Sequence, residues 1–203
     1  MQKGLLIVFE GIDGSGKTSQ ICRTKEYLEA KGYEVITTRE PGGTSIGTAI
    51  RGLLLDPAND KMTAACELLL YGADRAQHLE EQILPALVAG KAVISDRFSL
   101  STVAYQGYGR GLDKALIGRI GEIAACGVVP DKTFVLDVPV EVGFARVGKE
   151  QDRLESAGMD FMERVRQGYL TEAAKDKRVS VIDGTQTETA VFAAIRGELE
   201  HVL

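Results

Sequence analysis

The sequence predicts a three-layer α/β fold, in which a five-stranded parallel sheet lies between helices. Three observations lead to this prediction. A glycine-rich phosphate-binding pattern follows the first apolar run, further apolar runs of strand type recur along the chain, and stretches of helical periodicity separate them. Helices between successive strands imply right-handed crossovers, and therefore a parallel sheet that is covered on both faces. We expect the 203 residues to form one domain, residues 1–203.

The first strand and helix enclose the phosphate-binding pattern. Leu5–Phe9 is apolar and rich in strand formers, Gly11–Thr18 fits G-x-x-x-x-G-K-[ST] without a gap, and Thr18–Lys31 is compatible with a helix. Glycines let successive backbone N–H groups converge on phosphate oxygens, and the following helix adds the field of its positive end. This predicts the P-loop NTPase fold and a bound nucleoside triphosphate. The residues expected to hold it are Gly11, Ile12, Asp13, Gly14, Ser15, Gly16, Lys17 and Thr18.

The remaining elements are expected to alternate. The expected strands are 34–38, 92–95, 133–136 and 179–182, and the expected helices are 46–55, 62–87, 99–105, 114–126 and 187–203. Pro85 is expected to kink or end the long helix that contains it. Ligands of such sheets lie beyond the carboxyl ends of the strands. We therefore expect the chemistry at one edge, where the strands end in Glu10, Arg39-Glu40, Asp96-Arg97, Asp137 and Asp183.

Arginines are frequent at this edge, namely Arg39, Arg51, Arg75, Arg97 and Arg110. Most arginines are solvated surface charges, but Arg39 and Arg97 each directly follow an expected strand. Asp96 beside Arg97 combines a candidate ligand of Mg²⁺ or its water with a guanidinium that can bind phosphate in bidentate fashion. A second anionic substrate, besides the nucleotide, would explain so many arginines.

Composition and charge exclude other classes. The net charge of −5 argues against a non-specific nucleic-acid binder, and no apolar run reaches the length of a membrane span. Because Met1–Lys3 lead directly into the first expected strand, we expect no signal peptide. Cys22, Cys66 and Cys126 are odd in number and far apart, which favours reduced core thiols over disulfides or zinc. We expect a cytoplasmic protein whose partners include neither nucleic acid nor a membrane.

Over essentially its whole length the chain resembles bacterial thymidylate kinases (dTMP kinases). The matching segments are residues 9–18, 38–44, 67–78, 96–98 and 104–111. The Arg-Glu-Pro-Gly-Gly stretch at residues 39–43 and the Ala-Tyr-Gln-Gly stretch at 104–107 are much more specific than the phosphate loop. The resemblance implies transfer of the γ-phosphoryl group of ATP to dTMP, giving dTDP on the way to dTTP. It also implies Mg²⁺ and a homodimer.

The resemblance further implies residue roles. Asp13 would contact the deoxyribose 3′-hydroxyl and help to order Mg²⁺, while Tyr71 stacks on thymine and Arg75 bonds its O4. The four-residue spacing of Tyr71 and Arg75 puts both on one helical face, although a core aromatic is an alternative for Tyr71, where the family more often has Phe. With the arginines at the edge, the expected substrate-binding set is Asp13, Arg39, Arg51, Tyr71, Arg75, Arg97, Thr102, Tyr105 and Gln106.

A short mobile lid is expected at residues 147–156. One class of the family has an arginine inside the phosphate loop, but this loop has Gly14 and Ser15 there. The lid must then supply the arginine, for which we expect Arg153, with Arg146 able to point into the site from the preceding helix. The expected catalytic residues are Asp13, Lys17, Arg97, Arg146 and Arg153, and the expected metal ligands are Thr18 and Asp96.

Two other functions are compatible with parts of the pattern. A kinase for another nucleoside or nucleotide would share the loop and the arginines. A P-loop GTPase-type switch would need a guanine-reading Asn-Lys-x-Asp motif, which the sequence does not contain. The two histidines, His78 and His201, are expected as a helix-surface or supporting residue and as a tail residue.

Overall fold

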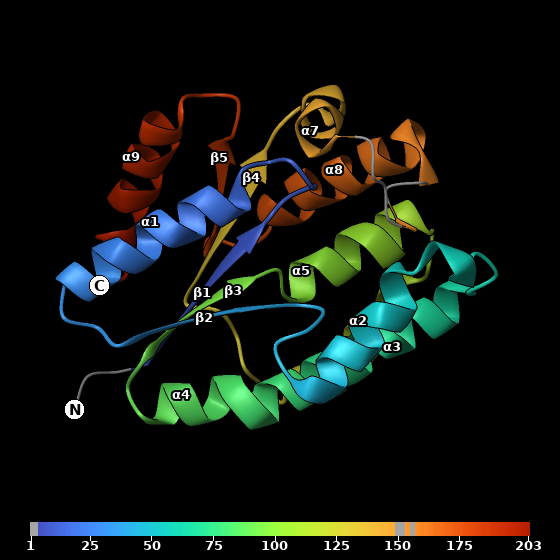
Figure 1. The fold of residues 1–203 in the computed structure, drawn as a ribbon, viewed down its shortest axis with the longest axis horizontal. Helices are drawn as coiled ribbons and strands as arrows, with labels where there is room; N and C mark the ends of the chain where they lie inside the picture. The colour runs from blue at the N-terminus through green and yellow to red at the C-terminus, as the bar shows by residue number, and fades with distance from the viewer. Residues whose placement is uncertain (1–3, 149–152, 155–156) are drawn as a thin grey trace.

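The computed structural model describes residues 4–148, 153–154 and 157–203. Within them a five-stranded sheet, parallel throughout, has the order β2-β3-β1-β4-β5 (Figure 1). The strands are β1 (Leu5–Glu10), β2 (Val35–Arg39), β3 (Ala92–Asp96), β4 (Lys132–Asp137) and β5 (Val179–Asp183). The predicted fold class is confirmed. Parallel order brings the carboxyl ends of the strands to one edge, as in other doubly wound sheets.

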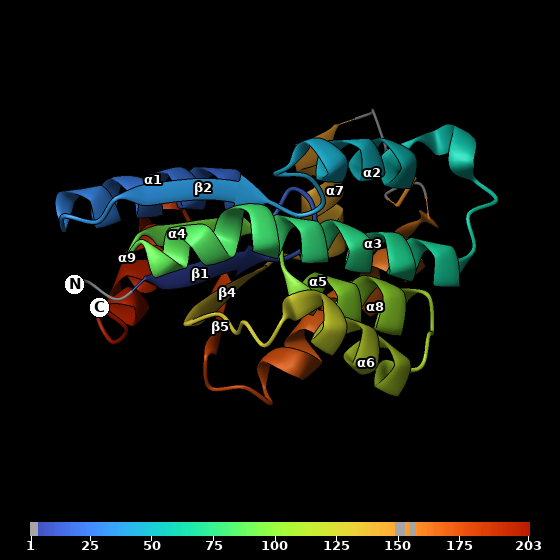
Figure 2. The same cartoon turned by 90° about the horizontal axis from the view of Figure 1, so that it is seen from below.

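Helices cover both faces of this sheet (Figures 1 and 2). They are α1 (Lys17–Ala30), α2 (Ser45–Leu55), η1 (Pro57–Asn59), α3 (Ala64–His78), η2 (Leu79–Ile83), α4 (Leu84–Val88), α5 (Ser99–Thr102), η3 (Val103–Gly109), α6 (Lys114–Ala125), α7 (Val140–Val147), α8 (Met159–Ala173) and α9 (Glu188–Leu199). Helices α1 and α9 contact each other on one side, and η3 packs along α8 on the other. None of the described helices combines the length and the apolar character needed to cross a bilayer.

The fully buried central strand β1 divides the core by its alternation. Leu5, Ile7 and Phe9 pack in a cluster with residues of α1 and α9, whereas Leu6 and Val8 pack with residues of η2 and α4. Successive side chains of a strand point to opposite faces, so a continuous apolar run serves both layers. The loop that leaves β1 is thereby anchored to a rigid base.

Two helical segments differ from the expected regular helices. The stretch expected at 62–87 is α3, then the π-helix η2, then α4, in whose first turn Pro85 lies. The helix expected at 99–105 continues from α5 into a second π-helix, η3. Such segments close i→i+5 hydrogen bonds and occur often at functional sites.

The structure also corrects the cysteines. Cys22, Cys66 and Cys126 are exposed free thiols, so the expectation of core thiols is wrong.

Of the expected lid at 147–156, residues 149–152 and 155–156 lie outside the described residues. The lid and the single-domain organisation stay predictions.

Candidate active site

The phosphate loop leaves β1 with a strained backbone that only glycine adopts readily. Gly11, Gly14 and Gly16 have φ of 131°, 75° and 98°. Gly16 precedes α1 without a side-chain cap, so no side chain competes for the first N–H groups of that helix. Inside the loop, Lys17 donates from Nζ to the carbonyl oxygens of Gly11 (3.1 Å) and Ile12 (3.0 Å). The loop thus holds a buried ammonium beside the first N–H groups of α1, a combination that is typical of phosphate-binding loops.

Helix α7 lies against this loop through two glycines. A Cβ atom on Gly14 would lie 2.3 Å from the carbonyl oxygen of Gly143, and a Cβ on Gly143 would lie 2.7 Å from the Asp13 carbonyl oxygen. The same helix carries Arg146, whose Nη1 donates to the carbonyl oxygens of Gly14 (3.2 Å) and Gly184 (3.2 Å). The close approach therefore places one guanidinium directly on the loop. Ser15 lies in the loop beside them, and its buried Oγ has no hydrogen-bond partner among the described residues.

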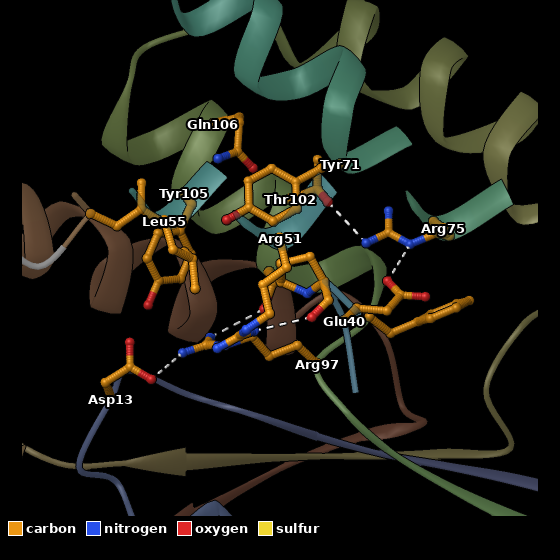
Figure 3. A pocket seen from close by; sticks show the side chains of 14 residues that line it. Asp13, Glu40, Arg51, Leu55, Tyr71, Arg75, Arg97, Thr102, Tyr105 and Gln106 are labelled. Atoms are coloured by element: carbon orange, nitrogen blue, oxygen red, sulfur yellow. Dashed lines mark hydrogen bonds and ion pairs between the residues drawn. The ribbon is translucent and has the colours of Figure 1, made fainter. Parts of the chain in front are cut away.

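A cavity adjoins the loop at the carboxyl edge of the sheet (Figure 3). Its walls come from the loop, from the segment after β2, and from α2, α3, α5 and η3. The lining residues are Asp13, Glu40, Pro41, Arg51, Leu55, Tyr71, Arg75, Arg97, Phe98, Ser101, Thr102, Tyr105, Gln106 and Leu154. One end is aromatic and apolar, and the other holds arginines next to the phosphate loop. This shape suits a flat ring joined to an anion.

Arg97 joins the cavity to the loop. It follows β3 with a φ of 74°, which is unusual for a residue other than glycine. Its Nη1 donates to the Gly11 carbonyl oxygen (2.9 Å) and its Nη2 to Asp13 Oδ1 (2.8 Å). Burial raises the pKa of Asp13, but the cations Arg97 and Lys17 together have the larger effect, and the net pKa is lowered to about 2. Asp13 is therefore ionised at neutral pH and can accept hydrogen bonds only.

The buried carboxyl group of Glu10 helps to fix Arg97, because both side chains contact Ser101 and Tyr169. Glu10, fully buried at the end of β1, accepts the backbone N–H groups of Phe98 (2.9 Å) and Ser101 (3.1 Å) and the hydroxyl of Tyr169 (3.1 Å). Burial raises the pKa of Glu10 above its ordinary value, although these hydrogen bonds and Arg97 oppose the shift. Arg97 in turn donates to Tyr169 (2.9 Å) and Ser101 (3.3 Å). The arginine is fixed from several sides.

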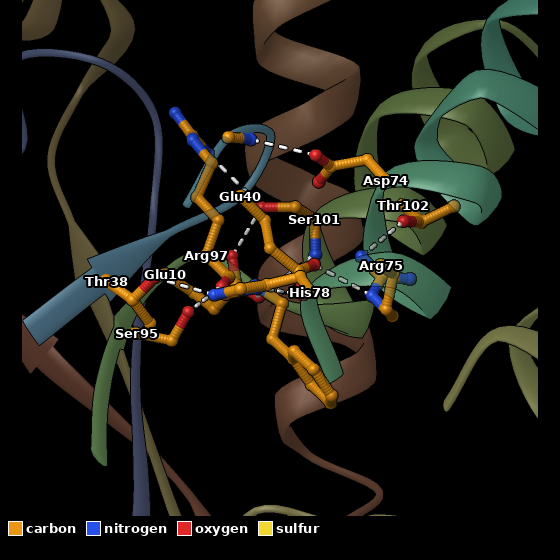
Figure 4. A network of polar contacts seen from close by, with 12 residues as sticks. Glu10, Thr38, Glu40, Asp74, Arg75, His78, Ser95, Arg97, Ser101 and Thr102 are labelled. Carbon is orange, nitrogen blue, oxygen red and sulfur yellow. Dashed lines mark hydrogen bonds and ion pairs between the residues drawn. The ribbon is translucent and has the colours of Figure 1, made fainter. Parts of the chain in front are cut away.

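At the aromatic end, Arg75 is held by a second buried network (Figure 4). Its Nε donates to Glu40 Oε2 (2.8 Å) and its Nη2 to the hydroxyl of Thr102 (3.0 Å). The other oxygen of Glu40 lies 3.1 Å from Nδ1 of His78, and Nε2 of that ring lies 2.6 Å from Thr38 Oγ1. His78 is completely buried, which excludes the helix-surface alternative and agrees with the other one, a supporting residue: it contacts Glu40, which in turn holds Arg75.

Gln106 belongs to a third network. Its Nε2 donates to Oε1 of Glu67 (2.8 Å), and both residues are 1% exposed. Arg110 donates to the two oxygens of Glu67 (3.2 and 3.0 Å), and Nη2 of Arg153 lies 2.6 Å from Oε2. Nε of Arg153 also donates to the Leu54 carbonyl oxygen (2.8 Å). Among the described residues Arg153 thus contacts Glu67 and Leu54, whereas the sequence-based expectation places its guanidinium at the transferring phosphoryl group. Its role at the phosphoryl group stays a prediction.

A second cavity is lined by the two predicted metal ligands and by Arg39. Thr18, Arg39, Arg51 and Asp96 line it, and Arg51 lines the first cavity as well, donating from Nη1 to the Pro41 carbonyl oxygen (3.0 Å). Oδ1 of Asp96 is buried and has no hydrogen-bond partner in the described part of the chain. A buried carboxylate oxygen without a partner calls for a cation or ordered water. Thr18 and Asp96 therefore fit Mg²⁺, which takes one or two protein ligands and completes its shell with water and phosphate.

The structure thus brings eight of the nine predicted substrate-binding residues together in one cavity, namely Asp13, Arg51, Tyr71, Arg75, Arg97, Thr102, Tyr105 and Gln106. Arg39 is apart from this set and faces the second cavity. Glu67 and Tyr169 are buried polar partners for which the sequence patterns predict no role, and Glu10 and Glu40 are predicted at the edge of the sheet without their partners. Glu10 and Glu40 lie inside the segments that carried the resemblance, but no pattern within those segments shows what they contact.

Known proteins resemble the chain over its whole length. A family model described as thymidylate kinase matches residues 9–195. A thymidylate kinase from Oleidesulfovibrio alaskensis is 44% identical, with 98% of each chain covered. One from Pelotomaculum thermopropionicum is 48% identical, covering 99% of this chain and 95% of that protein. The crystal structure of thymidylate kinase from Ehrlichia chaffeensis superposes with a TM-score of 0.80 at 37% identity, covering 98% of this chain and 99% of the other.

Proposed function

The chain belongs to the thymidylate kinase family of ATP-dependent nucleoside monophosphate kinases, and we propose that it transfers the γ-phosphoryl group of ATP to dTMP, giving dTDP. The observation that carries this proposal is the single cavity that joins an aromatic pocket to the phosphate loop through Arg97. A nucleoside monophosphate whose pyrimidine ring lies at Tyr71 and Arg75 would bring its 5′-phosphate to the arginines beside the loop. The donor and acceptor phosphates would then meet at one edge of the sheet.

The residues present suit this reaction. The acceptor is a phosphate oxygen that is largely ionised at neutral pH, because the second pKa of a phosphate monoester is about 6. No strong general base is needed, and the chain has to bring two polyanions together and stabilise charge on the transferred group. We assign the acceptor phosphate to Arg51 and Arg97, which line the acceptor cavity, and to Arg39, which lines the second cavity that Arg51 shares. We assign the β- and γ-phosphates to Lys17 and the loop amides.

Asp13 and the arginine on the loop complete the assignment. We assign the ionised carboxylate of Asp13, which Arg97 holds, to accept a hydrogen bond from the 3′-hydroxyl of the deoxyribose. Arg146 contacts the loop through Gly14, so we assign it the transition-state charge on the phosphoryl group that Arg153 was expected to meet. Mg²⁺, held by Thr18 and Asp96, would neutralise phosphate charge when bound.

A coupled assay of nucleoside monophosphates with ATP and Mg²⁺ tests the function. We expect dTMP to be the best acceptor. A missing methyl group in an apolar pocket lowers kcat/KM by about 10–200-fold, so dUMP should be weaker by that factor. AMP and GMP should fail because a purine is too large for the ring pocket. Efficient use of AMP or GMP in preference to dTMP would contradict the proposal, as would GTP hydrolysis without any acceptor.

We also propose the homodimer that the sequence resemblance implies. Leu69 on α3, Ile123 on α6 and Val129 after it are apolar and more than half exposed. Such side chains on neighbouring helices are typical of a surface covered by a partner. Sedimentation equilibrium should give a dimer, and Leu69→Glu should give a monomer; a monomeric wild type would contradict this. The cytoplasmic location stays a prediction.

A further inference from the structure

We propose that Glu67 sets the direction of the Gln106 amide, and that this direction makes the pocket select a pyrimidine with a hydrogen atom on N3. The inference rests on the proposed function, because it concerns which base the acceptor cavity admits. Glu67 does not line that cavity, whereas Gln106 does. Glu67 is therefore a positioning residue that acts through Gln106.

The contact between the two side chains allows one amide orientation only. Nε2 of Gln106 donates to Oε1 of Glu67 at 2.8 Å. If the amide were turned over, its oxygen would face a carboxylate oxygen at the same distance, and two acceptors would repel each other. Because both side chains are almost completely buried, no solvent relieves that repulsion. The amide oxygen is therefore directed away from Glu67.

Glu67 can play this part only if it stays ionised, and its surroundings ensure that it does. Burial raises its pKa, but the hydrogen bonds from Arg110 and Gln106 outweigh burial, and the net pKa lies below the ordinary value. The guanidinium of Arg153 adds a further cation at Oε2. An ionised carboxylate accepts and never donates, so the direction of the amide is fixed at neutral pH.

The cavity then presents a donor and an acceptor in a defined order. Arg75 can only donate: Nε is used by Glu40, Nη2 by Thr102, and Nη1 has no partner among the described residues. Gln106 contributes its Oε1, to which no described residue donates, and which lies on the Tyr71 side in Figure 3. A donor beside an acceptor matches the O4 and N3–H of thymine or uracil. Cytosine offers an amino donor and an unprotonated N3, which is the reverse order.

The substitution Glu67→Gln tests the inference. A neutral amide at position 67 can either donate or accept, so Gln106 becomes free to turn over. Since a hydrogen bond to a charged group differs from a neutral one by roughly tenfold or more in an equilibrium constant, the ratio of kcat/KM for dTMP over dCMP should fall by about 10–100-fold. The fall should come mainly from KM, with kcat for dTMP within about threefold of wild type.

Two further variants separate positioning from loosened packing. Arg110→Ala removes another partner of Glu67 but keeps the bond to Gln106, so the base ratio should stay within about threefold of wild type. In a Gln106→Ala background, which has no amide to direct, Glu67→Gln should change the ratio no further. Glu67→Asp keeps a negative charge for Arg110 and Arg153, but its shorter side chain moves the carboxylate away from Gln106. This variant is measured in place of Glu67→Gln if Glu67→Gln proves unstable, and the same fall of the base ratio is expected.

Different results would contradict the inference and the proposed function. An unchanged base ratio in Glu67→Gln or Glu67→Asp, an equal change in Arg110→Ala, or a full effect of Glu67→Gln without the Gln106 amide would each overturn the inference. A wild-type enzyme that does not phosphorylate dTMP would instead overturn the proposed function. The wild-type panel is measured first, so the two failures are distinguishable.

Discussion

Replacing Gly14 by alanine tests how α7 is placed on the phosphate loop. The added Cβ would lie 2.3 Å from the Gly143 carbonyl oxygen, about 1 Å closer than a normal carbon–oxygen contact. The φ of 75° adds about 1–2 kcal/mol for a residue with a Cβ, and overpacking against backbone adds about 1–3 kcal/mol. The free energy of unfolding should therefore fall by about 2–5 kcal/mol, unless α7 moves away by about 1 Å.

Either response affects Arg146, whose Nη1 lies 3.2 Å from the Gly14 carbonyl oxygen. A misplacement of about 1 Å can lower a rate by roughly 10²-fold, so we expect kcat of Gly14→Ala to fall on that scale. No residue of α7 lines the acceptor cavity, and the Kd for dTMP should stay within about threefold of wild type. Urea unfolding, steady-state kinetics and calorimetric titration with dTMP measure the three quantities.

Gly111→Ala is the matched control. Gly111 has a φ of 77°, and a Cβ there would meet nothing within 4 Å, so this variant carries the backbone strain without the clash. It should lose about 1–2 kcal/mol of stability and no activity. If Gly14→Ala lost no more stability than Gly111→Ala and kept kcat within threefold, the contact with Gly143 would not be what places α7.

Three further predictions concern charged residues of the site. Lys17→Ala should nearly abolish turnover while circular dichroism shows an intact fold, because this ammonium meets the charge on the transferred group; near-normal kcat would contradict the loop assignment. Arg146→Ala should lower kcat by about 10³-fold at unchanged dTMP affinity, and Arg153→Ala should raise the dTMP Kd while kcat stays within about tenfold; the opposite pattern would return the catalytic role to Arg153. Asp74 on α3 lies beside Glu40 and Arg75, and its Oδ1 accepts the backbone N–H of Gly42 at 2.9 Å. Burial raises the pKa of Asp74 to about 6, with the neighbouring Glu40 adding to the shift, so its contribution to stability is complete below pH 3.8 and is lost as the pH rises through 6. The stability of wild type relative to Asp74→Asn should fall by up to about 3 kcal/mol between pH 4 and pH 7, and a flat difference would show that Asp74 ionises normally.

The extent of what the sequence predicts follows from the range of the interactions involved. The backbone of the loop Gly11–Thr18 and the position of Arg39 and Arg97 at strand ends depend on neighbours in the sequence. In the structure Arg97 directly follows β3 as predicted, whereas Arg39 is the last residue of β2. The partner of Gln106 is 39 residues away and the partner of Arg75 is 35 residues away, in other elements. A buried glutamate has no local pattern that distinguishes it from a surface glutamate, so these partners could not be predicted.

Arg153 illustrates the same limit. The sequence shows an arginine in a polar, glycine-started segment after a helix, which is typical of a lid. The guanidinium, however, is bound by Glu67 of α3 and by a carbonyl oxygen at the end of α2. Whether Arg153 binds the Glu67 carboxylate or a phosphoryl group depends on how its segment packs against α2 and α3. Residue spacing along one segment does not encode that packing.

In the π-helical segment η3, the number of residues, and not only their identity, affects which base the pocket selects. A π-helix accommodates one residue more than an α-helix with the same number of turns, and it reverts when one residue is removed. Deleting one residue within η3 would return the segment to the α-helical spacing of about 100° per residue. The deletion would change how Gln106 and Arg110, both partners of Glu67, are directed relative to each other. The base pocket can therefore be remodelled by single-residue insertions and deletions in η3, a route that substitution libraries do not sample.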